Sequence, residues 1–332
     1  MRDPFGSLTG DELELLVRGP RPQVAPALAT LTDERFSSAE WLYERKLDGE
    51  RCLVYSTDGQ VDLRSRTNKP IAGQFPEIAD AFAAMDADDV IVDGEIVAFE
   101  GSRTSFARLQ PRMHAARATA GFRGIAVYFY AFDLLYAEGH DTRRLPLRRR
   151  KHVLREAIDF TGPIRYATHR NADGEAYFAH ACASGWEGLI AKRASAPYGN
   201  GRTRDWLKFK CELAQEFVIG GYTDPEGSRH GFGALLVGYY EGGVLHYAGK
   251  VGTGFSDRLL ALLWAAMKER AIDSPPFGHG ELPRKGVHWV RPELVGQVGF
   301  SEWTRDGRLR HPKFQGLRDD KLAADVVRER PT

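Results

Sequence analysis

The pattern of apolar runs changes near residue 212, and this change constrains the fold more than any other feature. Before it, strand-like runs such as 90–99 alternate with helical patterns at 147–160 and 173–184. After it, short strand-like runs separated by glycines are interrupted by one amphipathic helical pattern, at 256–270. The first pattern predicts an α+β domain with a central antiparallel sheet, and the second predicts an OB-type barrel.

These patterns divide the 332-residue chain into segments. Residues 1–40 contain prolines and no regular pattern, so we expect an N-terminal arm that packs on the core. We assign residues 41–212 to the α+β domain and residues 213–332 to the OB-fold domain. Within the first domain, two alternating apolar runs flank Thr57-Asp58-Gly59-Gln60, which predicts a β-hairpin.

Composition excludes several classes of protein. The chain is 42% hydrophobic and 27% charged, which is typical of a soluble globular protein. It has no apolar run of membrane-spanning length and no signal peptide, so we expect a cytoplasmic protein without membrane contact. Cys52, Cys182 and Cys211 are odd in number and widely spaced, which argues against disulfides and for a reducing compartment. Their spacing also argues against a structural zinc site.

Basic residues are clustered although the net charge is only +1. Clusters occur at 143–151, at Arg202 and Arg204, and at 305–310. The balanced total gives no evidence for nucleic-acid binding. The run at 143–151 begins a helical pattern, and we interpret it as the solvated face of that helix.

Lys46 follows the strand-like run 41–43 and opens the segment Lys46-Leu47-Asp48-Gly49-Glu50-Arg51. A lysine in this position can act as a nucleophile, with an acid and a second cation on fixed neighbours. Asp48 has two interpretations, as a turn residue before Gly49 or as an acid that protonates or positions a leaving group. K-x-D-G-x-R residues are common at surface turns, so this segment alone does not assign a function.

The pKa of Lys46 would have to fall for it to attack phosphorus. A free lysine has a pKa near 10.4, so only about one in 2,500 is neutral at pH 7. Arg51, Lys208, Lys210 and a bound metal would lower it by repelling the ammonium. In Lys208-Phe209-Lys210 the two lysines are separated by one residue, so both amines lie on one face of a predicted strand.

Other candidates stand inside strand-like runs. Glu95 and Glu187 lie beside glycines, and two such carboxylates suit a Mg²⁺ ion that keeps several waters. The alternative for each is a structural ion pair. Phe132 lies in a continuous apolar run, where core packing is the default.

Taken in order, these elements resemble the ATP-dependent DNA ligases of the covalent nucleotidyltransferase superfamily. The series continues from the lysine segment through Arg64-Ser65-Arg66, Asp93-Gly94-Glu95, Phe132-Asp133, Glu187-Gly188-Leu189-Ile190-Ala191-Lys192, Arg202 with Trp206-Leu207-Lys208-Phe209-Lys210, and Arg318-Asp319-Asp320-Lys321. The last element has the ligase form R-x-D-K. Order and spacing over nearly 280 residues carry the resemblance, which is closest to the compact ligase module of bacterial end-joining ligases.

The resemblance implies a role for each residue. Lys46 and Asp48 would be catalytic, Glu44 would read the adenine amino group, and Phe132 would stack on the purine. Glu95 would contact the ribose and, with Glu187, hold the metal. The remaining nucleotide contacts would come from Arg51, Arg66, Lys192, Arg202, Lys208 and Lys210, and from Arg318, Asp319 and Lys321 in the OB-fold domain. Of these, Arg51 and Arg66 would bind the ribose or the 5′-phosphate of the nick.

The function that this implies is ATP-dependent sealing of 5′-phosphate/3′-hydroxyl nicks in double-stranded DNA. It would use a lysyl-AMP intermediate and Mg²⁺ or Mn²⁺, in repair or end joining. We expect a monomer near the bacterial nucleoid, assisted by end-joining or other repair proteins. About 40 residues precede the core, too few for a helical DNA-binding domain, so we expect weak, salt-sensitive DNA binding. The alternatives are an RNA ligase, a GTP-dependent capping guanylyltransferase, or a non-catalytic OB-fold DNA-binding protein.

Overall fold

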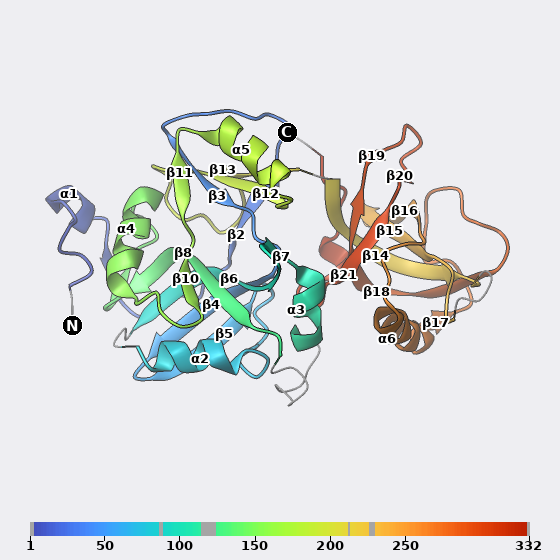
Figure 1. Cartoon of the computed structure of the whole chain (residues 1–332), viewed down its shortest axis with the longest axis horizontal. Coiled ribbons are helices and arrows are strands. Elements are labelled where there is room, and N and C mark those ends of the chain that lie inside the picture. Colours follow the sequence, from blue (N-terminus) through green and yellow to red (C-terminus); the bar gives the residue numbers. More distant parts are fainter. Residues whose placement is uncertain (1–2, 86–88, 114–123, 212, 226–229, 331–332) are drawn as a thin grey trace. The chain divides into compact units, whose positions relative to one another are not determined.

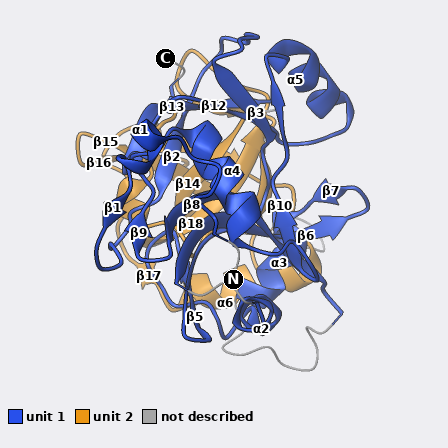
Figure 2. Ribbon diagram, turned by 90° about the vertical axis from the view of Figure 1, so that its left-hand side faces the viewer, with its two compact units in different colours: residues 1–211, 330–332 blue, residues 212–329 orange. Residues whose placement is uncertain are grey.

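A computed structural model of the chain describes residues 3–85, 89–113, 124–211, 213–225 and 230–330. The chain forms two compact units, Met1–Cys211 with Arg330–Thr332, and Glu212–Glu329 (Figures 1 and 2). The limit that we expected at residue 212, and the expected end at residue 332, lie outside the described residues. Sheets dominate both units and helices cover them, as an α+β fold requires.

The first unit contains an eight-stranded sheet with the order β1-β9-β8-β6-β4-β5, to which β10 and β7 are added. Its strands are β1 (Val17–Arg18), β4 (Glu50–Thr57), β5 (Gln60–Ser65), β6 (Val90–Glu100), β7 (Arg103–Thr104), β8 (Val127–Ala137), β9 (His140–Asp141) and β10 (Ile164–Tyr166). All pairs are antiparallel except β10 with β8. The predicted hairpin is confirmed as β4–β5, with Asp58 and Gly59 at φ 47° and 70°.

A second sheet in this unit has five strands in the order β11-β3-β12-β13-β2. They are β2 (Ala27–Leu31), β3 (Trp41–Arg45), β11 (His169–Asn171), β12 (Gly188–Arg193) and β13 (Gly201–Lys210). The expectation of an irregular arm is wrong for β2, which pairs in parallel with β13. Ala27 and Leu31 are buried, and pairing with β13 satisfies backbone groups that burial would otherwise isolate.

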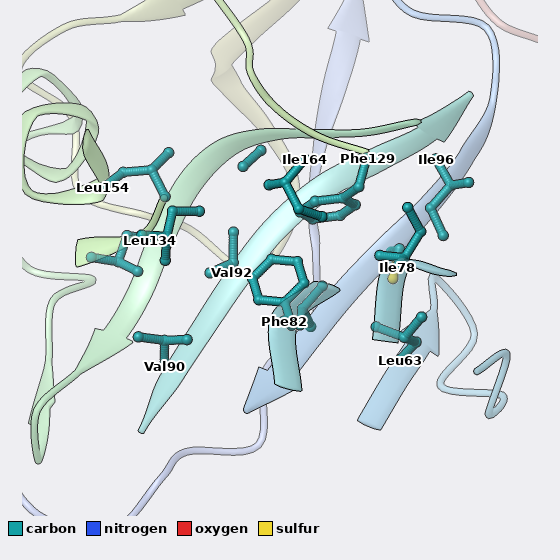
Figure 3. Close-up of a cluster of buried hydrophobic side chains, with 14 of the residues drawn as sticks. Leu63, Ile78, Phe82, Val90, Val92, Ile96, Phe129, Leu134, Leu154 and Ile164 are labelled. Atoms are coloured by element: carbon teal, nitrogen blue, oxygen red, sulfur yellow. The ribbon is translucent and has the colours of Figure 1, made fainter. Parts of the chain in front are cut away.

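Helices cover the outer faces of the first unit (Figure 1). They are α1 (Gly10–Leu13), α2 (Pro76–Ala83), α3 (Phe106–Met113), α4 (Leu147–Ala157) and α5 (Gly174–Ala183). Figure 3 shows Phe82 of α2 and Leu154 of α4 in one buried cluster with residues of β6 and β8. Phe82 meets Phe129 edge to face, with ring centroids 5.6 Å apart. The opposite face of the large sheet packs on the second sheet, as the contact of Phe132 with Trp206 illustrates.

The second unit is built on a six-stranded sheet with the order β16-β15-β14-β18-β17 and with β21 added to β18. Its elements are β14 (Leu213–Thr223), β15 (Leu235–Glu241), β16 (Val244–Val251), α6 (Asp257–Lys268), β17 (Ala271–Ile272), β18 (Val287–Phe300), β19 (Glu302–Trp303), β20 (Leu309–Arg310), β21 (Lys313–Leu317) and the 3₁₀ helix η2 (Ala323–Asp325). The longest of these strands is β18, with 14 residues. Gly296 keeps it continuous, because a Cβ there would lie 2.4 Å from the ring of Phe314.

The expectation that the cysteines form no disulfide is wrong. Cys182, in the last turn of α5, is bonded to Cys211 just after β13, with the two Cα atoms 5.3 Å apart. Sequence spacing missed this pair because the fold, rather than the chain order, brings α5 beside the end of β13. Cys52 is a buried thiol.

Among the described residues, no helix is both long enough and apolar enough to span a membrane.

Candidate active site

Lys46 extends β3 by one residue along the edge of β12. Its amide donates to the carbonyl of Gly188 at 2.9 Å. Gly188 has φ 146°, and a Cβ there would lie 1.8 Å from the carbonyl oxygen of Phe209, so only glycine permits this approach. The tight passage sets Glu187 beside Lys46, and the Lys46 ammonium forms an ion pair with the Glu187 carboxylate.

Carboxylates surround Lys46 in this structure. Burial alone would lower the pKa of Lys46, but attraction by Glu187, helped by Asp48 and Glu95, outweighs burial and raises it. We expected neighbouring cations to lower this pKa. The carboxylates have the opposite effect here, and they favour the ammonium form of Lys46.

Asp48 anchors the turn that follows Lys46. Its amide donates to Oγ1 of Thr104 at 3.1 Å, and its carboxylate accepts from the amide of Phe106 at 3.0 Å, where α3 begins. Next to it, a Cβ on Gly49 would lie 2.2 Å from the carbonyl of Ile96. These contacts favour the interpretation of Asp48 as a residue that positions the lysine segment.

Glu44 lies two residues before Lys46 and is buried between two lysines. Its Oε1 accepts from Nζ of Lys151 at 2.5 Å, and its Oε2 lies 2.7 Å from Nζ of Lys192. Burial would raise the pKa of Glu44, but attraction by Lys151 and Lys192 outweighs it and lowers the pKa. Burial is the main reason that the pKa of Lys192 falls to about 8, with repulsion by Lys151 adding to it.

The interpretation of the run 143–151 as a solvated helix face is wrong for its last two residues. Arg150 and Lys151 are 0% and 1% exposed, and Arg150 forms a bidentate pair with the buried Asp133. They stand three and four residues after the buried Leu147, on the inward face of α4. This spacing in the sequence places Lys151 on the buried face of the helix, which the charge of the run does not indicate.

Phe132 projects from β8 between the two sheets and is 7% exposed. Nζ of Lys192 lies 4.0 Å from its ring centroid, and the Arg51 guanidinium lies 4.7 Å away. Tyr130, two residues earlier on β8, lines a cavity of about 210 Å³ together with Arg45, Leu47, Ala167, Thr168, Tyr177 and Trp186. The sequence predicts Phe132 as the stacking residue and does not single out Tyr130, which borders the cavity.

The remaining arginines differ in their surroundings. Arg51 forms a bidentate pair with the buried Asp93, at 2.5 and 2.6 Å, so its guanidinium is directed into the protein. Arg66 is half-buried just after β5. Arg202 is exposed on β13 and donates to the carbonyl of Ala29 at 2.9 Å.

Strand register brings other predicted residues to the same region. Lys208 is opposite Ile190, and Lys210 is opposite Gly188, next to Glu187. Glu95 of β6 is opposite Arg51 and acts on the pKa of Lys46. The structure therefore gathers Lys46, Glu95, Glu187, Lys208 and Lys210 around the meeting of the two sheets.

Glu95 and Glu187 fit a hard divalent cation as two oxygen donors that leave other positions to water. In the described part of the chain, no group of three or more His, Cys, Asp or Glu residues could hold a metal ion. A metal held here would take few protein ligands, and Glu95 and Glu187 are the residues that could hold it.

Comparison with known proteins decides the family. Residues 22–210 match the ATP dependent DNA ligase domain, and residues 228–321 match the ATP dependent DNA ligase C terminal region. The chain belongs to the ATP-dependent DNA ligase family. The resemblance read from the ordered motifs is thereby confirmed.

Relatives of this ligase chain include multifunctional end-joining proteins. It is 37% identical over 321 residues to the multifunctional non-homologous end joining protein LigD of Pseudomonas aeruginosa, covering 94% of this chain and 37% of that protein. It is 38% identical over 315 residues to the multifunctional non-homologous end joining DNA repair protein LigD of Mycobacterium tuberculosis, covering 92% and 40%. The chain thus spans about two fifths of these curated relatives.

A solved structure shares the ligase fold. The mycobacterial DNA ligase D complexed with ATP and MES is 36% identical, has a TM-score of 0.67, and is matched over 92% of this chain and 98% of that one. The predicted fold, an adenylation domain followed by an OB-fold domain, is confirmed.

The C-terminal motif of the ligase chain lies in the second unit. Arg318 forms a bidentate pair with Asp320, with both contacts at 2.9 Å, and Asp320 is buried. Asp319, which the resemblance predicts as a nucleotide contact, is exposed. In the R-x-D-K pattern the aspartate is residue 320, so the sequence itself points to Asp320 rather than to Asp319. Nζ of Lys321 lies 4.0 Å from Glu216.

Proposed function

We propose that this chain is an ATP-dependent DNA ligase that seals nicks through a covalent lysyl-AMP intermediate. The observation that carries the proposal is Lys46, set at the meeting of two sheets beside Glu187, two residues after the buried Glu44. A lysine with neighbouring cations and carboxylates can attack a phosphoanhydride and keep the nucleotidyl group.

The first step forms one bond and breaks another. The Lys46 nitrogen, having given a proton to water and left its pair with Glu187, attacks the α-phosphorus of ATP. The new N–P bond replaces the bond to the bridging oxygen, and pyrophosphate departs. We assign charge stabilisation in this step to Lys208 and Lys210, with Arg202 at the phosphates. Asp48 holds the turn that aims the lysine.

A divalent cation fits this site through Glu95 and Glu187, and Mg²⁺ or Mn²⁺ would serve. When bound, such an ion supplies positive charge to the phosphate oxygens.

The next two steps act on DNA. The 5′-phosphate at a nick takes AMP from Lys46, and the 3′-hydroxyl then displaces AMP to close the strand. We propose Arg66 for the 5′-phosphate. Arg318, Asp319 and Lys321 are proposed to orient pyrophosphate, with Asp320 holding Arg318 in place. Arg51, paired with Asp93, is better suited to supporting Phe132 than to binding DNA.

The purine is proposed to lie between the two sheets, with Glu44 at its amino edge. Phe132 and Tyr130 share one face of β8, so either ring is a candidate for stacking. Replacing each by leucine separates them, because the stacking residue is the one whose loss weakens ATP binding more.

The substrate is proposed to be nicked double-stranded DNA in repair or end joining, in the bacterial cytoplasm near the nucleoid. Relatives named for non-homologous end joining support this choice. The chain is proposed to act as a monomer and to receive help from other repair proteins. Nick binding measured over a salt series tests the expectation of weak, salt-sensitive DNA binding, and tight binding that ignores salt would contradict it.

The intact mass of the protein after exposure to ATP tests the central proposal. A gain of one AMP that disappears on adding nicked DNA is the expected result. Label transferred from GTP alone would instead indicate a capping guanylyltransferase, and sealing confined to ribose 3′ ends would indicate an RNA ligase. An unmodified mass with both nucleotides would reject the proposed chemistry.

A further inference from the structure

Lys151 is a buried cation to which the proposed reaction assigns no role. Its Nζ donates to Oε1 of Glu44 at 2.5 Å, to the carbonyl of Ala167 at 3.0 Å and to the carbonyl of Phe132 at 3.4 Å. An ammonium has three donors, so these contacts use all of them. The ammonium also lies 4.7 Å from the ring centroid of Tyr166. Lys151 is therefore fixed in one position.

Lys151 and Lys192 hold Glu44 from two sides. The side chains of both lysines are 2% exposed and that of Glu44 is 4% exposed, so water contributes little to their solvation. An ionised carboxylate accepts hydrogen bonds at about four lone-pair sites and donates none. Two of these lone-pair sites on Glu44 face the lysines. The other sites can accept a hydrogen bond from a ligand but cannot donate one.

The neighbouring titratable group opposite Glu44 adds no proton to this cluster at neutral pH. His169 of β11 is in register with Glu44, and burial is the main reason that its pKa falls to about 4, with Lys151 next. Arg148 and Arg155 are the other cations that act on His169. The cluster thus consists of one carboxylate and two ammoniums, which keep Glu44 deprotonated.

We propose that Lys151 is a positioning residue that, together with Lys192, fixes Glu44 as a pure acceptor and so selects a purine carrying a 6-amino group over one carrying a 6-oxo group. This inference rests on the proposed function, because it places the purine edge at Glu44. A 6-amino group donates to the free lone pairs of Glu44. A 6-oxo group would face them with lone pairs of its own, and sites of this type discriminate strongly because a buried polar group is left unpaired.

Loss of one cation changes this selection in a specific way. With only Lys192 left, the Glu44 carboxylate is less restrained and takes up a proton more readily, and a protonated carboxyl can donate to a 6-oxo group. A lysine that only stabilised the fold would slow the reaction equally with both purines. The ratio of the two rates therefore separates the two roles.

The test measures lysyl-nucleotide formation by intact mass with ATP and with inosine triphosphate, whose base has an oxo group in place of the 6-amino group and a hydrogen on N1. The wild-type protein should react at least about 100-fold faster with ATP. Lys151→Met should reduce this ratio at least about tenfold, and Lys151→Arg, which keeps the charge, should retain more of it than Lys151→Met does. Arg149→Met removes a surface cation from the same helix and should leave the ratio unchanged, since Arg149 pairs with Glu12.

Distinct outcomes identify which idea fails. A wild-type ratio in folded Lys151→Met would overturn the inference and leave the proposed function intact. No adduct from the wild-type protein with either nucleotide would overturn the proposed function. If thermal melting shows that Lys151→Met does not fold, Lys192→Met removes the other cation, and an unchanged ratio in that variant would also overturn the inference.

Discussion

Lys46 and Lys192 both face a glutamate at the meeting of the two sheets, yet their pKa values move in opposite directions. Glu187, with Asp48 and Glu95, raises the pKa of Lys46 against the effect of burial. Burial, with repulsion from Lys151, lowers the pKa of Lys192 to about 8 although Glu44 attracts it. The difference follows from the charges around each lysine, because three carboxylates attract Lys46 whereas Lys192 shares Glu44 with a second cation.

Exposure separates the two pairs as well. The side chains of Lys46 and Glu187 are 19% and 20% exposed, so water or a ligand can replace either partner. Those of Lys192 and Glu44 are 2% and 4% exposed, and each would be left buried without its partner. The structure thus keeps Lys46, the proposed nucleophile, in a pair that can open, and Glu44, the proposed recognition carboxylate, in one that stays closed.

The largest expected effect is the loss of AMP transfer to the protein when Lys46, but not Lys192, is replaced. Lys46→Ala should abolish AMP transfer to the protein, because no other nitrogen occupies its place, whereas Lys192→Met should retain measurable adduct. Intact mass after ATP exposure checks both, with thermal melting as the control for folding. An AMP adduct on Lys46→Ala would remove the distinction.

Stability provides the next comparison, using the same substitution at both glutamates. Glu44→Gln leaves two buried ammoniums without a counter-ion and should lower the free energy of unfolding by about 3–5 kcal/mol. Glu187→Gln removes a partly exposed pair and should cost about 1 kcal/mol or less. Urea unfolding of both variants against the wild-type protein measures this. Equal losses would contradict the difference in burial.

The pKa of Lys192 predicts a smaller effect of pH on stability. Its pKa is about 8 in the folded chain and near 10.4 when unfolded. Between these values the unfolded chain binds more protons, so this residue makes stability rise as pH increases. From pH 7.5 to 9.5 its contribution should be about 2 kcal/mol or less. Lys192→Met should lack that rise in urea unfolding, and an identical pH slope would argue against a depressed pKa.

The smallest expected effect concerns the reactivity of Lys46 without nucleotide. Glu187→Gln removes the main attraction that raises the pKa of Lys46 while burial remains, so its pKa should fall. Competitive acetylation of Lys46 as a function of pH, read by peptide mass spectrometry, should show a midpoint at lower pH in the variant. Lys268, exposed at the end of α6, provides the internal reference. A midpoint shifted upward would mean that Glu187 does not control Lys46.

The sequence pattern predicted correctly those features that depend on residues close together in the chain. The β4–β5 hairpin follows from Asp58-Gly59, and the ordered motifs were sufficient to identify the ligase family. Contacts between segments far apart in the chain could not be predicted from such patterns. The bond from Cys182 to Cys211 and the strand β2 depend on packing that no local window contains.

The site shows the same division. The predicted residues on strands each belong to a recognisable sequence segment. Lys151 belongs to a run of basic residues, and its burial depends on its position on the inward face of α4. Tyr130 was missed because alternation along β8 gives it the same face as Phe132, and only the fold shows which ring borders the cavity.

The disulfide has a consequence for the integrity of the chain. Cys182 and Cys211 are 29 residues apart, and the segment between them contains Glu187, Lys192 and Lys208. A protease that cuts a single peptide bond inside this segment therefore produces two polypeptides that remain one molecule. Such a cut protein migrates intact on a gel until a thiol is added, when it separates into two fragments.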